Sequence, residues 1–194
     1  MVDKRPKPRL TPPALDKLTK AQKELRDAIA AGPRSTFMMR GPFAIWMEAP
    51  AFGMLAQKLG GHVRYKTAIP PRLSEFAILC TARIWRAQFE WEAHAPIAEK
   101  AGVKPATVRA LRAGRKPADA PADERAIYDF VQQLYRKRRV SDGLYKRVHK
   151  LFGDSGMVEF VGILGYYSMI SMTLNVFRAA TDPNEPAPFR EPAV

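Results

Sequence analysis

Glu90 and His94 are the side chains best spaced to do chemistry together, because they lie four residues apart in a segment with helical character. At that spacing two side chains share one helix face, with their Cβ atoms roughly 6 Å apart. A carboxylate beside an imidazole can exchange a proton. The same pair on an exposed helix would contribute only about a few tenths of a kcal/mol, and spacing alone favours that surface interpretation.

The surroundings of this pair favour a buried site instead. The run from Leu73 to Val103 is apolar on more than one side, through Phe76, Ile78, Leu79, Ile84, Trp85, Phe89, Trp91 and Ile97. Polar groups in such a setting are usually buried and hydrogen-bonded. Glu75, near the start of the same run, adds a second carboxylate to the candidate group.

The composition is that of an ordinary globular protein with an unusual charge. A chain of 194 residues is long enough for one domain with a real core, and its hydrophobic content of 46% is typical. The formal charge of +13 favours anionic partners without naming one. The N-terminus is basic and Pro-rich and has no apolar signal region, so we expect a cytoplasmic protein.

Cys80 is the only cysteine, which excludes an intramolecular disulfide, a two-thiol redox centre and a multi-cysteine zinc site. His62, His94 and His149 show no metal-ligand spacing. The sequence also has no phosphate-binding glycine loop. We therefore expect neither a metal nor a cofactor.

Nearly every long segment favours α-helix, and no strand alternation is present. We expect an all-α domain at 14–181, between a basic Pro-rich arm at 1–13 and a Pro-rich tail, extended or disordered, at 182–194. We expect helices at 11–32, 43–48, 105–113, 123–137, 142–152 and 154–180, and a loop at 34–42. A further helix starts at Pro50, and Gly60–Gly61 should weaken or end it. The central helix is expected over 75–100, with a kink near Gln88.

Two segments raise other functions. The apolar stretch 157–177 is long enough to suggest a membrane span, but Glu159, Ser168 and Asn175 favour a helix buried by its own core and by another subunit. Residues 135–150 carry seven Lys and Arg against one Asp. We interpret them as a solvated helix end, with a phosphate-binding patch as the alternative.

The central run resembles the helical core of the carboxymuconolactone decarboxylase family, in the superfamily that also contains the alkylhydroperoxidase D proteins. The thiol branch has a Glu, then Cys-x-x-Cys a dozen residues later, then a His four residues after the second Cys. Here the pattern places the Glu on Glu75, the two Cys positions on Ala87 and Glu90, and the His on His94. Segments 41–75 and 159–177 resemble the family's lead-in helices and final core helix, so the resemblance covers roughly residues 41–180.

Both ends of the pattern match, and both sulfurs are missing. In the thiol branch the second Cys attacks peroxide and the first resolves it, and neither Ala87 nor Glu90 can do this. The decarboxylase branch lacks the thiols and likewise places a Glu four residues before the His. The resemblance implies an all-helical, alkylhydroperoxidase D-like bundle, assembly as a homo-trimer or hexamer, and a role in aromatic-compound catabolism.

The resemblance therefore favours a cofactor-independent lyase or proton-transfer enzyme for a small anionic cyclic acid or lactone. Decarboxylation leaves a negative charge on the ring, and a proton must then be transferred to carbon. The site must also exclude water. We expect Glu75, Glu90 and His94 to be catalytic, and His94, with an ordinary pKa near 6.5, suits proton transfer. Candidates for substrate binding are Arg72, Arg83 and Arg86, which could instead form structural ion pairs, and Trp91, Tyr166, Tyr167 and Asn175.

Two alternatives stay open. The first is a peroxidase that uses Cys80, although Cys80 lies outside the thiol motif. The second is a non-catalytic helical oligomer that binds an anionic ligand or nucleic acid through its basic surface. Nucleic-acid binding of that kind would weaken steeply with salt.

Overall fold

The computed structural model describes residues 7–33, 39–179, 181 and 186–190, and the described residues contain helices and no β-strand. The all-α prediction is therefore confirmed. After a 3-10 turn at Leu15–Lys17, the α-helices are α1 Lys20–Ala30, α2 Gly41–Trp46, α3 Pro50–Tyr65, α4 Pro71–Trp85, α5 Gln88–Lys100, α6 Pro105–Arg112, α7 Ala122–Lys137 and α8 Asp142–Phe177.

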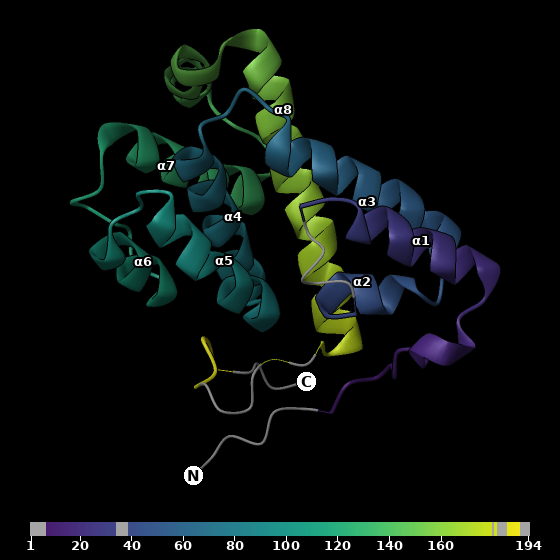
Figure 1. The fold of residues 1–194 in the computed structure, drawn as a ribbon. Coiled ribbons are helices and arrows are strands. Elements are labelled where there is room, and N and C mark those ends of the chain that lie inside the picture. Colours follow the sequence, from purple (N-terminus) through teal and green to yellow (C-terminus); the bar gives the residue numbers. More distant parts are fainter. Residues whose placement is uncertain (1–6, 34–38, 180, 182–185, 191–194) are drawn as a thin grey trace.

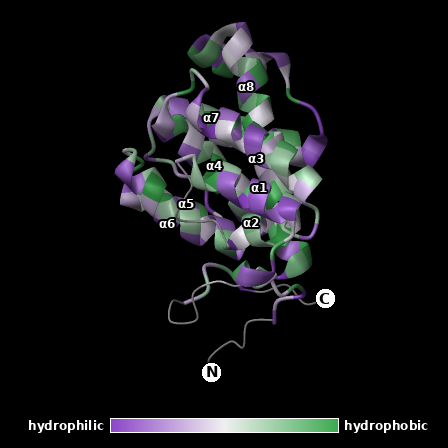
Figure 2. Cartoon of the chain, turned by 45° about the vertical axis from the view of Figure 1, so that its right-hand side comes forward, coloured by the Kyte–Doolittle hydropathy of each residue, from purple (hydrophilic) through white to green (hydrophobic). Residues whose placement is uncertain are grey.

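Helix α8 is the central element of the bundle. It packs against α2 and α3 on one side and against α4, α5 and α7 on the other (Figure 1). Outer helices such as α1 and α7 carry hydrophilic and hydrophobic residues together, as amphipathic helices do (Figure 2). By length and composition α8 could cross a membrane, and 44% of its apolar window is buried inside the bundle.

Two predicted helix boundaries were wrong. The first α-helix begins at Lys20 and not near Thr11, because Thr19 and Gln22 form a capping box: the Gln22 N–H donates to Thr19 Oγ1, and the Thr19 N–H donates to Gln22 Oε1. Helix α3 continues through Gly60–Gly61 to Tyr65. Its packing against α1 and α8 outweighs the low helix propensity of the two glycines.

The sequence predicts one helix over 75–100 with a kink near Gln88, whereas the structure has two helices there, α4 and α5, joined by a turn. Arg86 adopts a left-handed conformation with φ +49°, and the Ala87 N–H donates to the Ala82 carbonyl to close α4. Helix α5 then starts at Gln88 and packs back against α4. A second break lies inside α8, where Gly153 has φ +64° and separates the two helical segments that the sequence predicts.

The two ends of the chain are only partly described. Residues 7–13 form no helix, and the Arg9 N–H donates to the Phe177 carbonyl at the end of α8. In the tail, residues 186–190 form neither helix nor strand and bend at 188–189, and Phe189 is buried. The rest of the predicted N-terminal arm at 1–6, most of the predicted loop at 34–38, and residues 182–185 and 191–194 of the tail lie outside the described residues.

Candidate active site

His94 lies between two carboxylates at the centre of the structure. Its Nδ1 is 2.6 Å from Glu75 Oε2 on α4, and its Nε2 is 3.0 Å from Glu90 Oε1, one turn earlier on α5. The side chains of His94, Glu90 and Glu75 are only 5%, 5% and 7% exposed. The pair predicted from spacing is therefore buried, and the turn at Arg86 brings in Glu75 as the third member.

The two contacts fix the protonation state of His94. A neutral imidazole can donate from one nitrogen only, whereas an imidazolium donates from both. Burial by itself lowers the pKa of His94, but the charges of Glu75 and Glu90 outweigh it and raise that pKa to about 9. At neutral pH the three side chains therefore form a carboxylate–imidazolium–carboxylate group, which we call the triad.

Arg64 balances the remaining charge of the triad. It projects from the last turn of α3, its side chain is 13% exposed, and its Nε lies 3.8 Å from Glu75 Oε1. Burial lowers the pKa of Arg64, but Tyr167, Glu75, Tyr65 and Glu90 raise it above its ordinary value, so the guanidinium stays charged. The site thus contains two anions, Glu75 and Glu90, and two cations, His94 and Arg64.

A small cavity of about 50 Å³ adjoins the triad. Its polar lining residues are Arg64, Glu90, His94, Tyr166 and Tyr167, and its other lining residues are Pro42, Phe43, Gly60, Phe89, Ala93, Ile97 and Ile170. The Tyr167 ring stands edge-on to His94 with 5.1 Å between ring centroids. Burial raises the pKa of Tyr167 well above its ordinary value, so its hydroxyl keeps its proton. The cavity is thus a mostly apolar space with proton-bearing groups on one wall.

Of the seven predicted substrate-binding residues, only Tyr166 and Tyr167 line this cavity. Trp91 is buried but packs edge-on against Phe189, with 5.1 Å between ring centroids. Asn175 is exposed, and its Nδ2–H donates to the Trp85 carbonyl. These two side chains have structural contacts elsewhere in the bundle.

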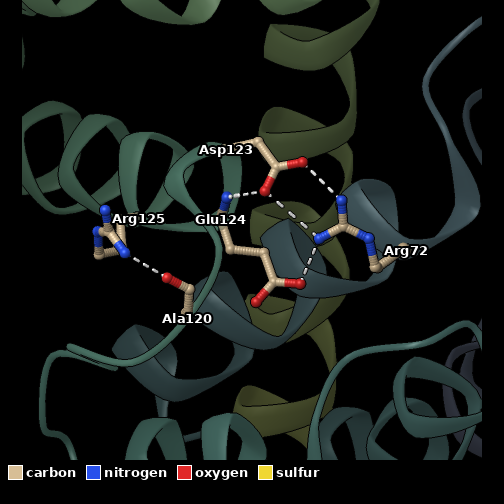
Figure 3. Close-up of polar contacts among 5 residues, drawn as sticks. All are labelled: Arg72, Ala120, Asp123, Glu124 and Arg125. Carbon is tan, nitrogen blue, oxygen red and sulfur yellow. Dashed lines mark hydrogen bonds and ion pairs between the residues drawn. The ribbon is translucent and has the colours of Figure 1, made fainter.

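The three predicted arginines also lie outside the cavity lining. Arg72 pairs with Asp123 and Glu124 at the start of α7, at 2.5 Å from each carboxylate (Figure 3). Arg83 donates from Nε to the Arg112 carbonyl and lies over the Phe189 ring. Arg86 is exposed at the turn after α4. The structure gives Arg72 and Arg83 other partners, leaves Arg86 exposed, and places Arg64 at the cavity.

Arg64 is not among the predicted site residues, because it lies beyond Gly60–Gly61, where the sequence predicts that the helix weakens or ends. A continuous helix places Gly60 and Arg64 on one face, four residues apart, and both line the cavity. Among the described residues, no group of three or more His, Cys, Asp or Glu side chains is arranged to hold a metal ion.

The raised pKa of His94 predicts a specific pH dependence of stability. Because the pKa is about 9 in the folded chain and near 6.5 in the unfolded chain, the stabilisation is complete below pH 6.5 and is lost as the pH rises through 9. The loss is on the order of 3 kcal/mol. Urea unfolding from pH 6 to pH 10 should show this loss in the wild type and not in a His94→Gln variant; parallel pH profiles would contradict the assignment.

Comparisons with known proteins bear on the fold. Neither a family model nor a curated protein matches the chain. Among solved structures, it is similar to the alkylhydroperoxidase AhpD core of an uncharacterized peroxidase-related protein from Ralstonia eutropha JMP134, with a TM-score of 0.75 and 15% sequence identity. The similarity covers 91% of this chain and 93% of that one. The chain therefore has the alkylhydroperoxidase D-like helical fold.

Proposed function

We propose that this protein is a cofactor-independent acid–base enzyme of the carboxymuconolactone decarboxylase type, acting on a small anionic cyclic acid or lactone. The observation that carries the proposal is the buried Glu75–His94–Glu90 triad beside a mostly apolar cavity. Buried ionisable groups in such a setting are characteristic of proton-transfer sites. The decarboxylase-type sequence pattern adds the substrate class.

Glu90 is the member of the triad that exchanges a proton with the substrate. Both ring nitrogens of His94 already face carboxylates, whereas Glu90 also lines the cavity. Glu75 lies behind His94, holds the orientation of its ring and stabilises its positive charge. His94 then acts as the proton reservoir of Glu90.

The proposed reaction needs one proton and no other reactant. Breaking the bond to the carboxylate carbon releases carbon dioxide and leaves the electron pair on the ring carbon, delocalised onto the neighbouring carbonyl. The His94 imidazolium passes its Nε2 proton to Glu90, and Glu90 donates that proton to the ring carbon and returns to the carboxylate form. The neutral His94 then takes up a proton again. The apolar wall keeps water from the carbanion. Tyr167, which keeps its hydroxyl proton, can donate a hydrogen bond to a developing oxyanion.

The test is turnover of carboxylated lactones, followed by carbon dioxide release and by proton exchange in deuterated water. Substituting Glu90→Gln, His94→Gln or Glu75→Gln should each lower kcat by roughly 10²–10⁴, the usual cost of losing general acid–base catalysis. Glu99→Gln is the matched control, because Glu99 is an exposed carboxylate on the same helix. If the triad variants fold and retain activity within about threefold of the control, the proposed roles are wrong.

The structure disfavours a thiol peroxidase, although the similar solved structure belongs to a peroxidase-related protein. Cys80 is 1% exposed on α4 and is not among the residues that line the cavity. Burial raises the pKa of its thiol far above the ordinary value, so the nucleophilic thiolate is suppressed. A peroxidase would need both the thiolate and access to it.

We therefore predict that the native protein does not consume alkyl hydroperoxide in the presence of a dithiol reductant. Cys80 should react with an aromatic disulfide reagent only after denaturation, because the folded chain excludes the reagent. A Cys80→Ser variant provides the control for both measurements. Peroxide consumption by the wild type that is abolished in Cys80→Ser would restore the peroxidase function.

We also propose a homo-oligomer, the trimer or hexamer that the family resemblance implies. Seven exposed apolar side chains lie on α3 and α8, two helices that pack against each other: Phe52, Leu55, Leu59, Val158, Val161, Met172 and Val176. Neighbouring subunits that covered these side chains would remove them from water.

A further inference from the structure

Arg64 is a nearly buried guanidinium without a hydrogen-bond acceptor. Its nearest carboxylate oxygen, on Glu75, lies 3.8 Å from Nε, which is beyond hydrogen-bond distance. Its other close contact is the Tyr65 ring, with 5.2 Å between Arg64 Cζ and the ring centroid. No acceptor for its N–H groups is found in the described part of the chain. Arg64 is thus ion-paired with Glu75 but has N–H donors without an acceptor, and leaving largely buried donors unsatisfied is costly.

The position of Arg64 indicates what would satisfy it. The side chain lines the same cavity as Glu90 and His94. A guanidinium presents two parallel N–H donors that match the two oxygens of a carboxylate. With a volume of about 50 Å³, the cavity has room for a small ligand beside Arg64.

A bound anion would disturb the charge balance of the site. Arg64 on α3 and His94 on α5 are positive, and Glu75 on α4 and Glu90 on α5 are negative. Helix α8 adds the neutral Tyr166 and Tyr167, and α2 adds Pro42 and Phe43, which do not titrate. One further negative charge in this desolvated space is stabilised if a carboxyl group of the triad takes up a proton.

We propose that Arg64 binds the carboxylate of a small organic acid, and that this binding delivers one proton to the Glu75–His94–Glu90 triad. Anion binding would thereby load the acid that the reaction needs. Only the assignment of this carboxylate to the substrate rests on the proposed function. The carboxylate bound by Arg64 must be one that the substrate keeps. Binding of the carboxylate that leaves as carbon dioxide would stabilise its charge and oppose its loss.

The test is an NMR titration of the full-length protein with acetate, with acetamide as the uncharged control of the same shape. Uptake of one proton makes the Kd for acetate rise by about tenfold per pH unit between pH 6 and pH 8, whereas acetamide should show no such slope. A Kd for acetate that does not change with pH would overturn the proton uptake.

Variants test the role of Arg64 itself. Arg64→Gln should weaken acetate binding at least tenfold. Arg64→Lys keeps the positive charge but loses the two parallel N–H donors, and it should weaken acetate binding less. Arg136→Gln removes an exposed arginine at the end of α7 and should bind acetate as the wild type does. Wild-type affinity in Arg64→Gln would overturn the proposal. If Arg64→Gln does not fold, affinity and pH slope in Arg64→Lys equal to those of the wild type would overturn it instead.

These binding experiments are independent of turnover. Acetate binding through Arg64 in a protein that does not exchange protons with any lactone would contradict the proposed function and leave the anion site standing. If the protein turns over a lactone and the Arg64→Gln variant binds acetate normally, the proposed function is supported and the anion site at Arg64 is contradicted.

Discussion

The site depends on one interaction, the imidazolium of His94 held between Glu75 and Glu90. Moving an isolated charge into a protein interior is strongly unfavourable, and a buried charge persists when partners of opposite sign surround it. Here one cation bridges two anions, and Arg64 supplies the second positive charge beside Glu75. Removing any one of the four leaves an uncompensated charge in the core, so their positions are interdependent.

The surrounding helices provide what this interaction requires. The left-handed turn at Arg86 reverses the chain, so that α5 returns His94 to Glu75 on α4. Helix α8 contributes Tyr167, whose ring forms a T-shaped contact with the His94 ring and adds no charge to the site. Helix α3 reaches the site because it continues through two glycines. The catalytic proposal and the fold thus rest on the same contacts.

Local patterns in the sequence predicted the local features well. The helix starts at Pro50 and Pro105 and the four-residue spacing of Glu90 and His94 are determined by neighbouring residues. The pairing of Glu75 with His94 is tertiary, and only the family pattern suggested it. Whether a sequence-predicted residue is catalytic remains a prediction that the turnover experiments test.

The arginines show why the lining of the cavity could not be predicted from the sequence. Arg72, Arg83 and Arg86 are near the motif in sequence, but the direction of a helical side chain depends on which helices pack around it. Arg72 faces the acidic start of α7 (Figure 3), whereas Arg64, on a different helix, faces the cavity. Proximity in sequence to Glu75 therefore did not identify the arginine that lines the cavity.

The site depends on a positively charged His94 ring. NMR of the two imidazole nitrogens in ¹⁵N-labelled protein measures the protonation of that ring most directly. The structure predicts that both nitrogens carry a proton at pH 7.5 and that the ring titrates near pH 9. The matched reference is the His94 resonance in the urea-unfolded chain, which should titrate near its ordinary pKa of about 6.5. A single protonated nitrogen at pH 7.5 in the folded protein would contradict the account.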